Sequence, residues 1–464
     1  MIRLVVVFLL SLLALAAPAA AASPRAGCPA GGACSSRQAD REALAAAVEE
    51  VIARTTLAQA RVAVHVVSLD DGTVVYSRNA DELLNPASNV KLFTSAAALV
   101  RLGPEFRFET ELLVDDQSTL KRKPQSPGDI RGNLYVRGKG DPSLSSERLW
   151  GLVNELHIAG LRSVSGDLVL DDSWFDAERS GPGFDQERSD RAYMAPTGAL
   201  SLNSNAIGIH VAPGAAVGAP ARVELDLGSD YFVIENKVQT TRARSLRRVY
   251  FSSVAAGDKQ RIVVSGRIPL ESPTVSNWRK IDEPSLYFGH SLKSLLAQRG
   301  IKVRGKVVRG LTPETARSYL LHRSDTLDLV LKRVNKNSSN FFAEQLVKTL
   351  GAQVQGPPGS WTKGIGVVEE FLATEIGIGL GTFVMKNGSG LNDTNRFSAS
   401  QICLLLRAMW KRFPLAPEYL SSLGITAKDG TVHYRMEGTE AAGRLRAKTG
   451  TLENVSALSG YVQT

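Results

Sequence analysis

Alternating apolar and polar positions predict an antiparallel hairpin near the start of the chain. Residues 61–67 and 73–76 alternate on either side of Asp70-Asp71-Gly72, a turn sequence typical of hairpins. Asn85-Pro86 then precedes an alanine-rich apolar run, which predicts a helix ending near Leu102. These elements indicate a domain of mixed helices and strands.

A β-rich tract interrupts this pattern. Short apolar runs punctuated by Gly and Pro predict strands in FRFETELLV, GNLYVRG, GDLVLDD, ARVELDL and RIVVSGRI. Mixed helix and strand patterns return after it. We therefore predict an α/β (α+β) domain with a mostly antiparallel sheet, split into residues 35–102 and 275–464 by a β-rich insertion at 103–274.

The N-terminus predicts export. Arg3 supplies a positive charge, residues 4–15 an apolar core, and the alanines up to Ala22 offer cleavage sites, so residues 1–22 are typical of a signal peptide. A membrane anchor is the alternative, but the apolar stretch is short. Residues 23–40 are expected to be a loose leader, and the mature protein periplasmic or otherwise extracytoplasmic.

Cysteine content and charge fit an exported protein. Cys28 and Cys34 can close a small disulfide in an oxidising compartment, whereas Cys403 lies in an apolar run and is expected in the core. The net charge of +9 suits an anionic partner. Basic residues are scattered without interleaved aromatics, so we expect no nucleic-acid binding and instead contact with a polyanionic wall or a membrane surface.

Three short motifs carry the candidate chemistry. Ser88-Asn89-Val90-Lys91, Ser338-Ser339-Asn340 and Lys448-Thr449-Gly450 match, in order, the S-x-x-K, S-x-N and K-T-G motifs of serine enzymes that react with D-alanyl-D-alanine peptides and β-lactams. Ser118–Lys121 and Ser201–Asn203 match the first two patterns by chance, in worse surroundings. The K-T-G sequence occurs once.

Ser88 and Lys91 form the expected nucleophile and base. Three residues apart on one helix, they share a face, and the helix start favours developing negative charge. Lys91 must be neutral part of the time, which burial and a second cation, Lys448, would promote. The alternative is that Ser88 is a helix cap beside a solvated lysine.

Ser338 and Asn340 are expected to relay a proton and to hold the acylated peptide. The alternative is that Asn337-Ser338 only caps the helix that follows. Capping and catalysis are compatible, so this alternative does not exclude the role.

The K-T-G segment lies in a strand-like stretch and is expected to bind substrate. Lys448 and Thr449 would hold a carboxylate, and Gly450 would let substrate backbone approach closely. The backbone N–H groups of Ser88 and Thr451 would form the oxyanion hole.

Other chemistries have little support. None of the six histidines shows H-x-x-x-H spacing and there is no C-x-x-C pair, so we expect no metal and no cofactor. A G-x-S-x-G sequence is also missing, which argues against a Ser-His-Asp hydrolase.

The chain resembles the D-alanyl-D-alanine carboxypeptidase/endopeptidase family of class C low-molecular-mass penicillin-binding proteins. The resemblance covers about residue 45 to the end, in stretches such as GDPSL, GDLVLDDSWFD, YMAPTGALSLNSN, NGSGLNDTNRFS and AAGRLRAKTGTL. It implies a transpeptidase/β-lactamase-like domain, two nested inserted domains and a serine acyl-enzyme. Peptidoglycan peptides would be the substrates and β-lactams the covalent inhibitors.

Two features depart from that family. Asn392-Asp393-Thr394 stands where the family often has a basic residue, while Asp171 matches a position linked to stem-peptide recognition. Only 16 residues follow Lys448, so we expect an incomplete C-terminus. A family strand between residues 456–462 and the N-terminal hairpin would then be missing, which would leave a gap in the sheet.

Two alternative functions remain open. A β-lactamase would need a Glu after the S-x-N motif to activate water, but Glu283 precedes Ser338. A wall-binding protein with a relic active site would suit the positive charge, although a relic has no chemical reason to keep all three motifs.

Overall fold

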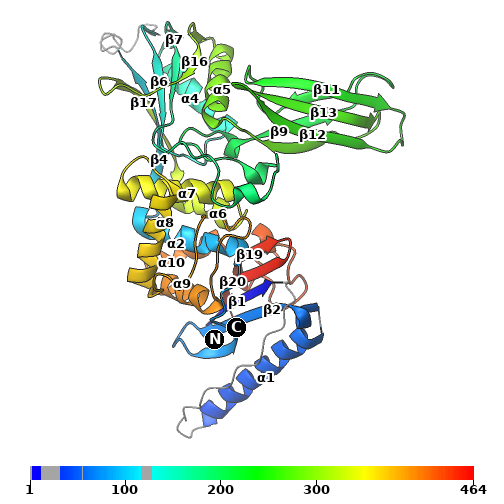
Figure 1. The fold of residues 1–464 in the computed structure, drawn as a ribbon, viewed down its shortest axis with the longest axis vertical. Coiled ribbons are helices and arrows are strands. Elements are labelled where there is room, and N and C mark those ends of the chain that lie inside the picture. The colour runs from blue at the N-terminus through cyan, green and yellow to red at the C-terminus, as the bar shows by residue number, and fades with distance from the viewer. Residues whose placement is uncertain (1–2, 12–31, 55, 116–127, 464) are drawn as a thin grey trace. The chain divides into compact units, whose positions relative to one another are not determined.

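The computed structural model describes residues 3–11, 32–54, 56–115 and 128–463, and the chain divides into two units (Figure 1). The first consists of Met1–Val100, Leu331–Ser338 and Val368–Thr464. The second consists of Arg101–Val330 and Ser339–Val367. The domain boundaries expected from the sequence, at 103 and 274, stay a prediction.

A six-stranded sheet organises the first unit. Its order is β18-β19-β20-β1-β2-β3, and every neighbouring pair is antiparallel. The hairpin and the K-T-G strand expected from the sequence are both present. The strands are β1 (Arg3–Ser11), β2 (Arg61–Ser68), β3 (Val74–Arg78), β18 (Gly424–Ile425), β19 (Leu445–Leu452) and β20 (Val455–Gln463).

The gap expected between β20 and the hairpin is filled. Strand β1 lies there and pairs along its length with both neighbours, Leu4 opposite Ser68 on one side and opposite Val462 on the other. The predicted gap is therefore wrong for this chain, because its own N-terminal apolar segment supplies the missing partner. The signal-peptide prediction concerns the same residues, and cleavage after Ala22 would remove β1.

Helices also lie wholly or partly in the first unit. They are α1 (Gly32–Arg54), α2 (Val90–Leu102), α9 (Ala399–Lys411) and α10 (Ala416–Ser422), together with parts of α6 (Leu327–Asn335) and α8 (Trp361–Phe371). Helix α9 is tied to β20 by the Tyr461 hydroxyl, which donates to the Leu406 carbonyl at 2.8 Å. Cys403 of α9 is buried, as predicted. Helix α1 begins at Gly32, so residues 32–40 are helical rather than a loose leader; Cys28 and the side chain of Cys34 lie outside the described part.

The second unit confirms the β-rich tract, since all five predicted runs contain strands. Its sheets are small and mixed, so the expected mostly antiparallel arrangement holds for the six-stranded sheet but not for the whole molecule. The strands are β4 (Arg107–Val114), β5 (Gly128–Ile130), β6 (Leu134–Gly138), β7 (Leu161–Val164), β8 (Leu168–Asp171), β9 (Ala206–Ala212), β10 (Arg222–Leu225), β11 (Phe232–Thr241), β12 (Arg248–Ala256), β13 (Lys259–Pro269), β14 (Val275–Lys280), β15 (Lys302–Val303), β16 (Val307–Arg309) and β17 (Arg317–Thr326).

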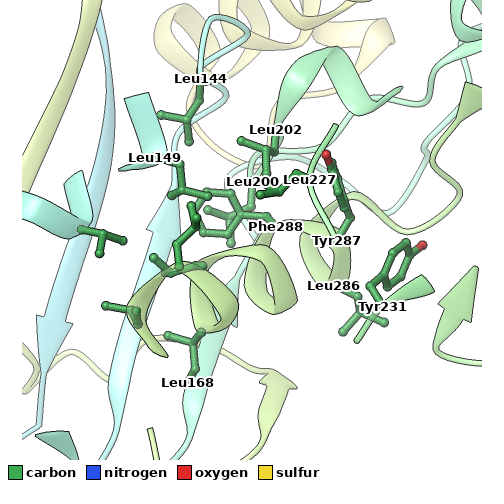
Figure 2. Packing of buried hydrophobic residues seen from close by; sticks show 14 of the residues in the cluster. Leu144, Leu149, Leu168, Leu200, Leu202, Leu227, Tyr231, Leu286, Tyr287 and Phe288 are labelled. Atoms are coloured by element: carbon green, nitrogen blue, oxygen red, sulfur yellow. The ribbon is translucent and has the colours of Figure 1, made fainter. Parts of the chain in front are cut away.

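One hydrophobic core joins these sheets to helices α4 (Ser146–Ile158) and α5 (Pro284–Gln298). Figure 2 shows Leu286, Tyr287 and Phe288 of α5 together with leucines from α4, from β8 and from nearby loops. Tyr231, just before β11, packs against Tyr287 with ring centroids 5.9 Å apart. Helix α7 (Asn340–Gln355) also belongs to this unit.

Candidate active site

Ser88 and Lys91 meet at the start of α2. Ser88 lies in a short 3₁₀ turn (Ala87–Asn89) that leads directly into the helix. The Nζ atom of Lys91 lies 3.0 Å from Ser88 Oγ and donates to the Ser389 carbonyl at 2.6 Å. Lys91 is fully buried. The spacing of three residues therefore places an amine against the hydroxyl, as the sequence predicted.

The loop before Ser88 is held in an uncommon conformation. Ala87 has a φ of 45°, which a residue with a Cβ rarely adopts. The Asn85 side chain stabilises it by accepting from Ala87 N at 2.8 Å and donating to Asp393 Oδ1 at 2.9 Å. Asp393 also pairs with Arg396 at 2.7 Å. The sequence motifs predict no role for Asn85, although an Asn before a Pro at a helix start is an available signal.

Lys448 brings a second buried amine into the same unit. Its Nζ atom donates to Ser338 Oγ at 2.8 Å and to the Thr449 carbonyl at 2.6 Å. Burial, and next the charge of Lys91, hold the pKa of Lys448 well below its ordinary value. Two serine hydroxyls thus each contact a buried amine, an arrangement suited to moving protons.

Ser338 is not the cap of the following helix. It has a φ of 56° and its hydroxyl faces Lys448, whereas Ser339 caps α7 by accepting from Phe342 N at 3.4 Å. The predicted alternative role of Asn337-Ser338 as a cap is therefore wrong. Asn340 is the first residue of α7, in the second unit, and its amide donates to the Tyr193 carbonyl at 3.2 Å.

The K-T-G strand passes close to the Ser88 loop. A Cβ on Gly450 would lie 2.7 Å from the Pro86 carbonyl oxygen and 3.1 Å from Ser88 N, so only glycine fits without a shift. Thr451, also in β19, follows directly. The first unit therefore brings together Ser88, Lys91, Ser338, Lys448, Thr449, Gly450 and Thr451.

Strand β19 has an edge that its neighbour β18 does not cover. Among the described residues, β18 pairs only with Arg446 and Ala447 and Thr426 N donates to the Leu445 carbonyl at 3.1 Å, so β19 has no strand partner on that side from Lys448 onward. An extended peptide can add to such an edge. Thr449 points its hydroxyl to Thr431 Oγ1 at 2.7 Å, a contact that no sequence motif predicts.

The remaining candidates lie elsewhere. Asp171 is buried in the second unit; burial opposes its ionisation, but hydrogen bonds from Ser173 and Thr312 outweigh this and lower its pKa. Ser201 donates to the Gly198 carbonyl at 2.8 Å, a structural contact. Ser118–Lys121 lies outside the described residues.

The described residues, 3–11, 32–54, 56–115 and 128–463, offer neither a metal-binding cluster nor a membrane-spanning helix. Those ranges contain no group of three or more His, Cys, Asp or Glu residues that could hold a metal ion. Nor do they contain a helix both long and apolar enough to cross a membrane.

Known proteins are similar to this chain in sequence and in fold. The D-Ala-D-Ala carboxypeptidase 3 (S13) family matches residues 44–464. A D-alanyl-D-alanine carboxypeptidase of Actinomadura sp. (strain R39) is 36% identical over 411 residues, 86% of this chain and 74% of the relative. The D-alanyl-D-alanine carboxypeptidase DacB of Haemophilus influenzae is 26% identical over 404 residues, 85% of this chain and 81% of the relative.

Solved structures agree on the fold. Penicillin binding protein 4 (dacB) from H. influenzae superposes with a TM-score of 0.72 at 23% identity, covering 85% of this chain and 88% of that one. Its complex with a β-lactam gives a TM-score of 0.66 with the same coverage. The family match spans the motif-bearing segments of both units. This chain therefore belongs to the D-Ala-D-Ala carboxypeptidase 3 (S13) family.

Proposed function

We propose that this protein is an exported serine D-Ala-D-Ala carboxypeptidase with endopeptidase activity, acting on peptidoglycan stem peptides through an acyl-enzyme on Ser88. The observation that carries the proposal is the contact of Lys91 with Ser88, in the same unit as the contact of Lys448 with Ser338. Family membership supports the same reaction.

In the proposed reaction, Ser88 Oγ attacks the carbonyl carbon of the bond before the terminal D-alanine, and neutral Lys91 takes the hydroxyl proton. The N–H groups of Ser88 and Thr451 stabilise the oxyanion. When the C–N bond breaks, Ser338 passes a proton to the leaving amine. Water then hydrolyses the ester and restores the serine.

Substrate binding would use the K-T-G strand. Lys448 and Thr449 hold the terminal carboxylate, and Asn340 holds the peptide that becomes the acyl group. A carboxylate beside Lys448 would favour its charged form, opposing the effect of burial. Substrate binding and the protonation state of Lys448 are therefore coupled.

We also propose the cellular setting. Residues 1–22 direct export, and the protein works outside the cytoplasm on peptidoglycan peptides, with β-lactams as covalent inhibitors. The domains follow the split expected from the sequence, a transpeptidase-like domain at 35–102 and 275–464 around an insertion at 103–274.

Fluorescent penicillin tests the nucleophile. Wild-type protein should be labelled covalently and Ser88→Ala should not be labelled. Ser118→Ala, which alters the other S-x-x-K sequence, is the matched control and should be labelled normally. Labelling should survive chelation of metals. A folded wild-type protein that takes up no label would refute the proposal.

The two alternatives give different results. Glu283, the residue considered for a β-lactamase, pairs with Arg309 at 2.8 Å in the second unit, so we expect slow nitrocefin hydrolysis and a long-lived adduct. Rapid turnover would favour a β-lactamase. Retained sedimentation of Ser88→Ala with purified peptidoglycan would show an additional wall-binding role.

A further inference from the structure

The second unit carries a cationic sheet face with no assigned role. Strands β11, β13 and β12 form a three-stranded sheet, drawn in Figure 1 as an arm leading away from α5. Residues 232–269 contain eight basic and two acidic residues, a net charge of +6. All eight basic side chains are exposed. This one sheet and its loops therefore concentrate positive charge.

Most of these cations form no ion pair with another described residue. Lys237 pairs with Glu235 at 2.7 Å. Within the described part of the chain, the other seven form no ion pair: Arg242, Arg244, Arg247, Arg248, Lys259, Arg261 and Arg267. Unpaired arginines are available to bind phosphate groups, because the guanidinium matches their geometry.

The charge is highest at one end of the arm. Strand β11 begins next to Tyr231, which packs on α5, and its ten residues run about 33 Å from there. The crossing loop 242–247 follows, and Arg248 at the start of β12 lies opposite Arg267 of β13. Five arginines thus gather where β11 ends and β12 begins.

Large apolar side chains are exposed among these arginines. Leu246, in the crossing loop, is 62% exposed, and Tyr250 of β12 is 61% exposed. Val254 and Val233 are exposed further along the same sheet. A soluble polyanion gains nothing from such side chains, whereas a lipid surface accommodates them between its headgroups.

We propose that the surface formed by the exposed side chains of β11-β13-β12 and by loop 242–247 docks on an anionic phospholipid surface. The arginines would contact lipid phosphates, and Leu246 would lie in the interfacial layer. A basic residue near such a surface contributes about 1 kcal/mol, so the arginines together can hold the protein there. A nucleic acid fits less well, because base stacking calls for rows of exposed aromatics.

Vesicle co-sedimentation tests this. Full-length protein should sediment with phosphatidylglycerol vesicles at low salt and not with phosphatidylcholine vesicles. Replacing Arg242, Arg244, Arg247 and Arg248 with Gln should weaken binding on the order of a hundredfold or more, and Leu246→Ser should weaken it separately. The matched control replaces four exposed basic residues of the same unit, Lys302, Arg304, Lys306 and Arg317, with Gln.

Three outcomes would overturn the proposal. Equal loss in both quadruple variants would show a net-charge effect only. Unchanged binding in the arginine variant would show that another surface is used. Full competition by soluble polyphosphate, with no effect of Leu246→Ser, would indicate a polyanion site instead. Penicillin labelling of each variant reports that it is folded.

A second, independent inference concerns Thr431 and rests on the proposed function. Thr431 lies in a 3₁₀ turn (Gly430–Val432), and its hydroxyl is 2.7 Å from that of Thr449. The turn is anchored to the S-x-N segment, since Thr431 N donates to the Lys336 carbonyl at 3.0 Å and Lys336 pairs with Asp429 at 2.5 Å.

We infer that Thr431 is a positioning residue that donates its hydroxyl proton to Thr449 Oγ1. Thr449 has one hydroxyl proton, and if Thr431 fills its acceptor position, that proton stays available for a substrate carboxylate. If the direction of the bond were reversed, Thr449 would donate its hydroxyl proton to Thr431 and could not donate it to the substrate. The anchoring through Lys336 fixes the turn in place for this purpose.

Penicillin and its methyl ester separate this role from a structural one. Thr431→Val should lower the acylation efficiency of benzylpenicillin by roughly tenfold, because Thr449 loses the donor that orients its hydroxyl proton toward the carboxylate, and its hydrogen bond to that charged group is weakened. Acylation by the methyl ester, which lacks the carboxylate, should not change. Thr431→Ser should restore wild-type behaviour.

Contrary outcomes are distinguishable. If wild-type protein is acylated and Thr431→Val behaves identically, the inference fails while the proposed function stands. An equal loss with the ester would also refute it, since the effect would not involve the carboxylate. If wild-type protein is not acylated at all, the proposed function itself fails.

Discussion

Lys448 Nζ lies 2.8 Å from the hydroxyl of Ser338, a residue 110 positions earlier in the chain. Both groups are within the first unit, and Lys448 has no exposed surface. An ammonium in such a position is costly, which is why the pKa of Lys448 falls well below its ordinary value. The contact links the S-x-N and K-T-G motifs directly.

The depressed pKa of Lys448 predicts how stability depends on pH. Between the folded-state and unfolded-state pKa values, the unfolded chain binds a proton that the folded chain has released. The free energy of unfolding therefore rises with pH in that window. Below the folded-state pKa, the destabilisation caused by burying the charged ammonium is fully present. In urea unfolding between pH 7 and 9, the free energy of unfolding should rise less with pH for Lys448→Met than for wild type.

Lys386→Met is the control for that experiment, because Lys386 is an exposed lysine of the same unit. It should follow the wild-type pH profile. Identical profiles for all three proteins would contradict the assignment of the pH dependence to Lys448.

Gly450→Ala should impair acylation without unfolding the protein. The added Cβ would lie 2.7 Å from the Pro86 carbonyl oxygen, so the Ser88 loop must shift. Misplacing reacting groups by about 1 Å can cost on the order of a hundredfold in rate. Stopped-flow acylation by a fluorescent penicillin measures this effect.

Gly151→Ala is the matched control, because a Cβ at Gly151 has no atom within 4 Å and the residue lies inside α4. It should leave acylation unchanged and raise stability by up to about 1 kcal/mol. Normal acylation by Gly450→Ala would show that the loop tolerates the shift.

Asp176→Asn should destabilise the protein more than Lys348→Met. The buried ammonium of Lys348 pairs with Asp176 at 2.6 Å and lies 4.0 Å from the centre of the Trp361 ring. Burial lowers the pKa of Lys348, and Asp176 opposes that shift. Removing only the carboxylate leaves an uncompensated charge, which costs about 3 kcal/mol, whereas Lys348→Met removes that charge.

Chemical denaturation of both variants gives the comparison. The penalty of Asp176→Asn should shrink at pH 9, because the lysine can then lose its proton more easily. A larger loss for Lys348→Met would indicate that packing of the lysine chain matters more than its charge.

Removing residues 1–22 should destabilise the first unit. Strand β1 pairs with β2 and β20, so its removal leaves the N–H and C=O groups of two strands without partners. We expect a lower thermal midpoint, a tendency to aggregate and slower acylation than in the 464-residue chain. Thermal unfolding and penicillin labelling of both forms measure this. A cooperative monomer with normal acylation would show that the sheet closes in another way.

Local sequence patterns determined much of this protein. The alternation at 61–67 predicted β2, and the alanine-rich run after Pro86 predicted α2, because both patterns report burial of one face or of a whole element. The three motifs identified Ser88, Ser338 and Lys448. Their side chains are placed by fixed spacing or by position in a strand, which a sequence displays directly.

Only the tertiary structure decided which distant groups meet. The contacts of Asn85 with Asp393, of Lys91 with the Ser389 carbonyl and of Thr431 with Thr449 join segments up to 308 residues apart. The cap of α7 is Ser339 rather than the alternative Asn337-Ser338, which a sequence cannot distinguish because Asn, Ser and Ser in succession are all good caps. The place of β1 in the sheet was missed, because strand pairing depends on which edge is free once the other strands have folded.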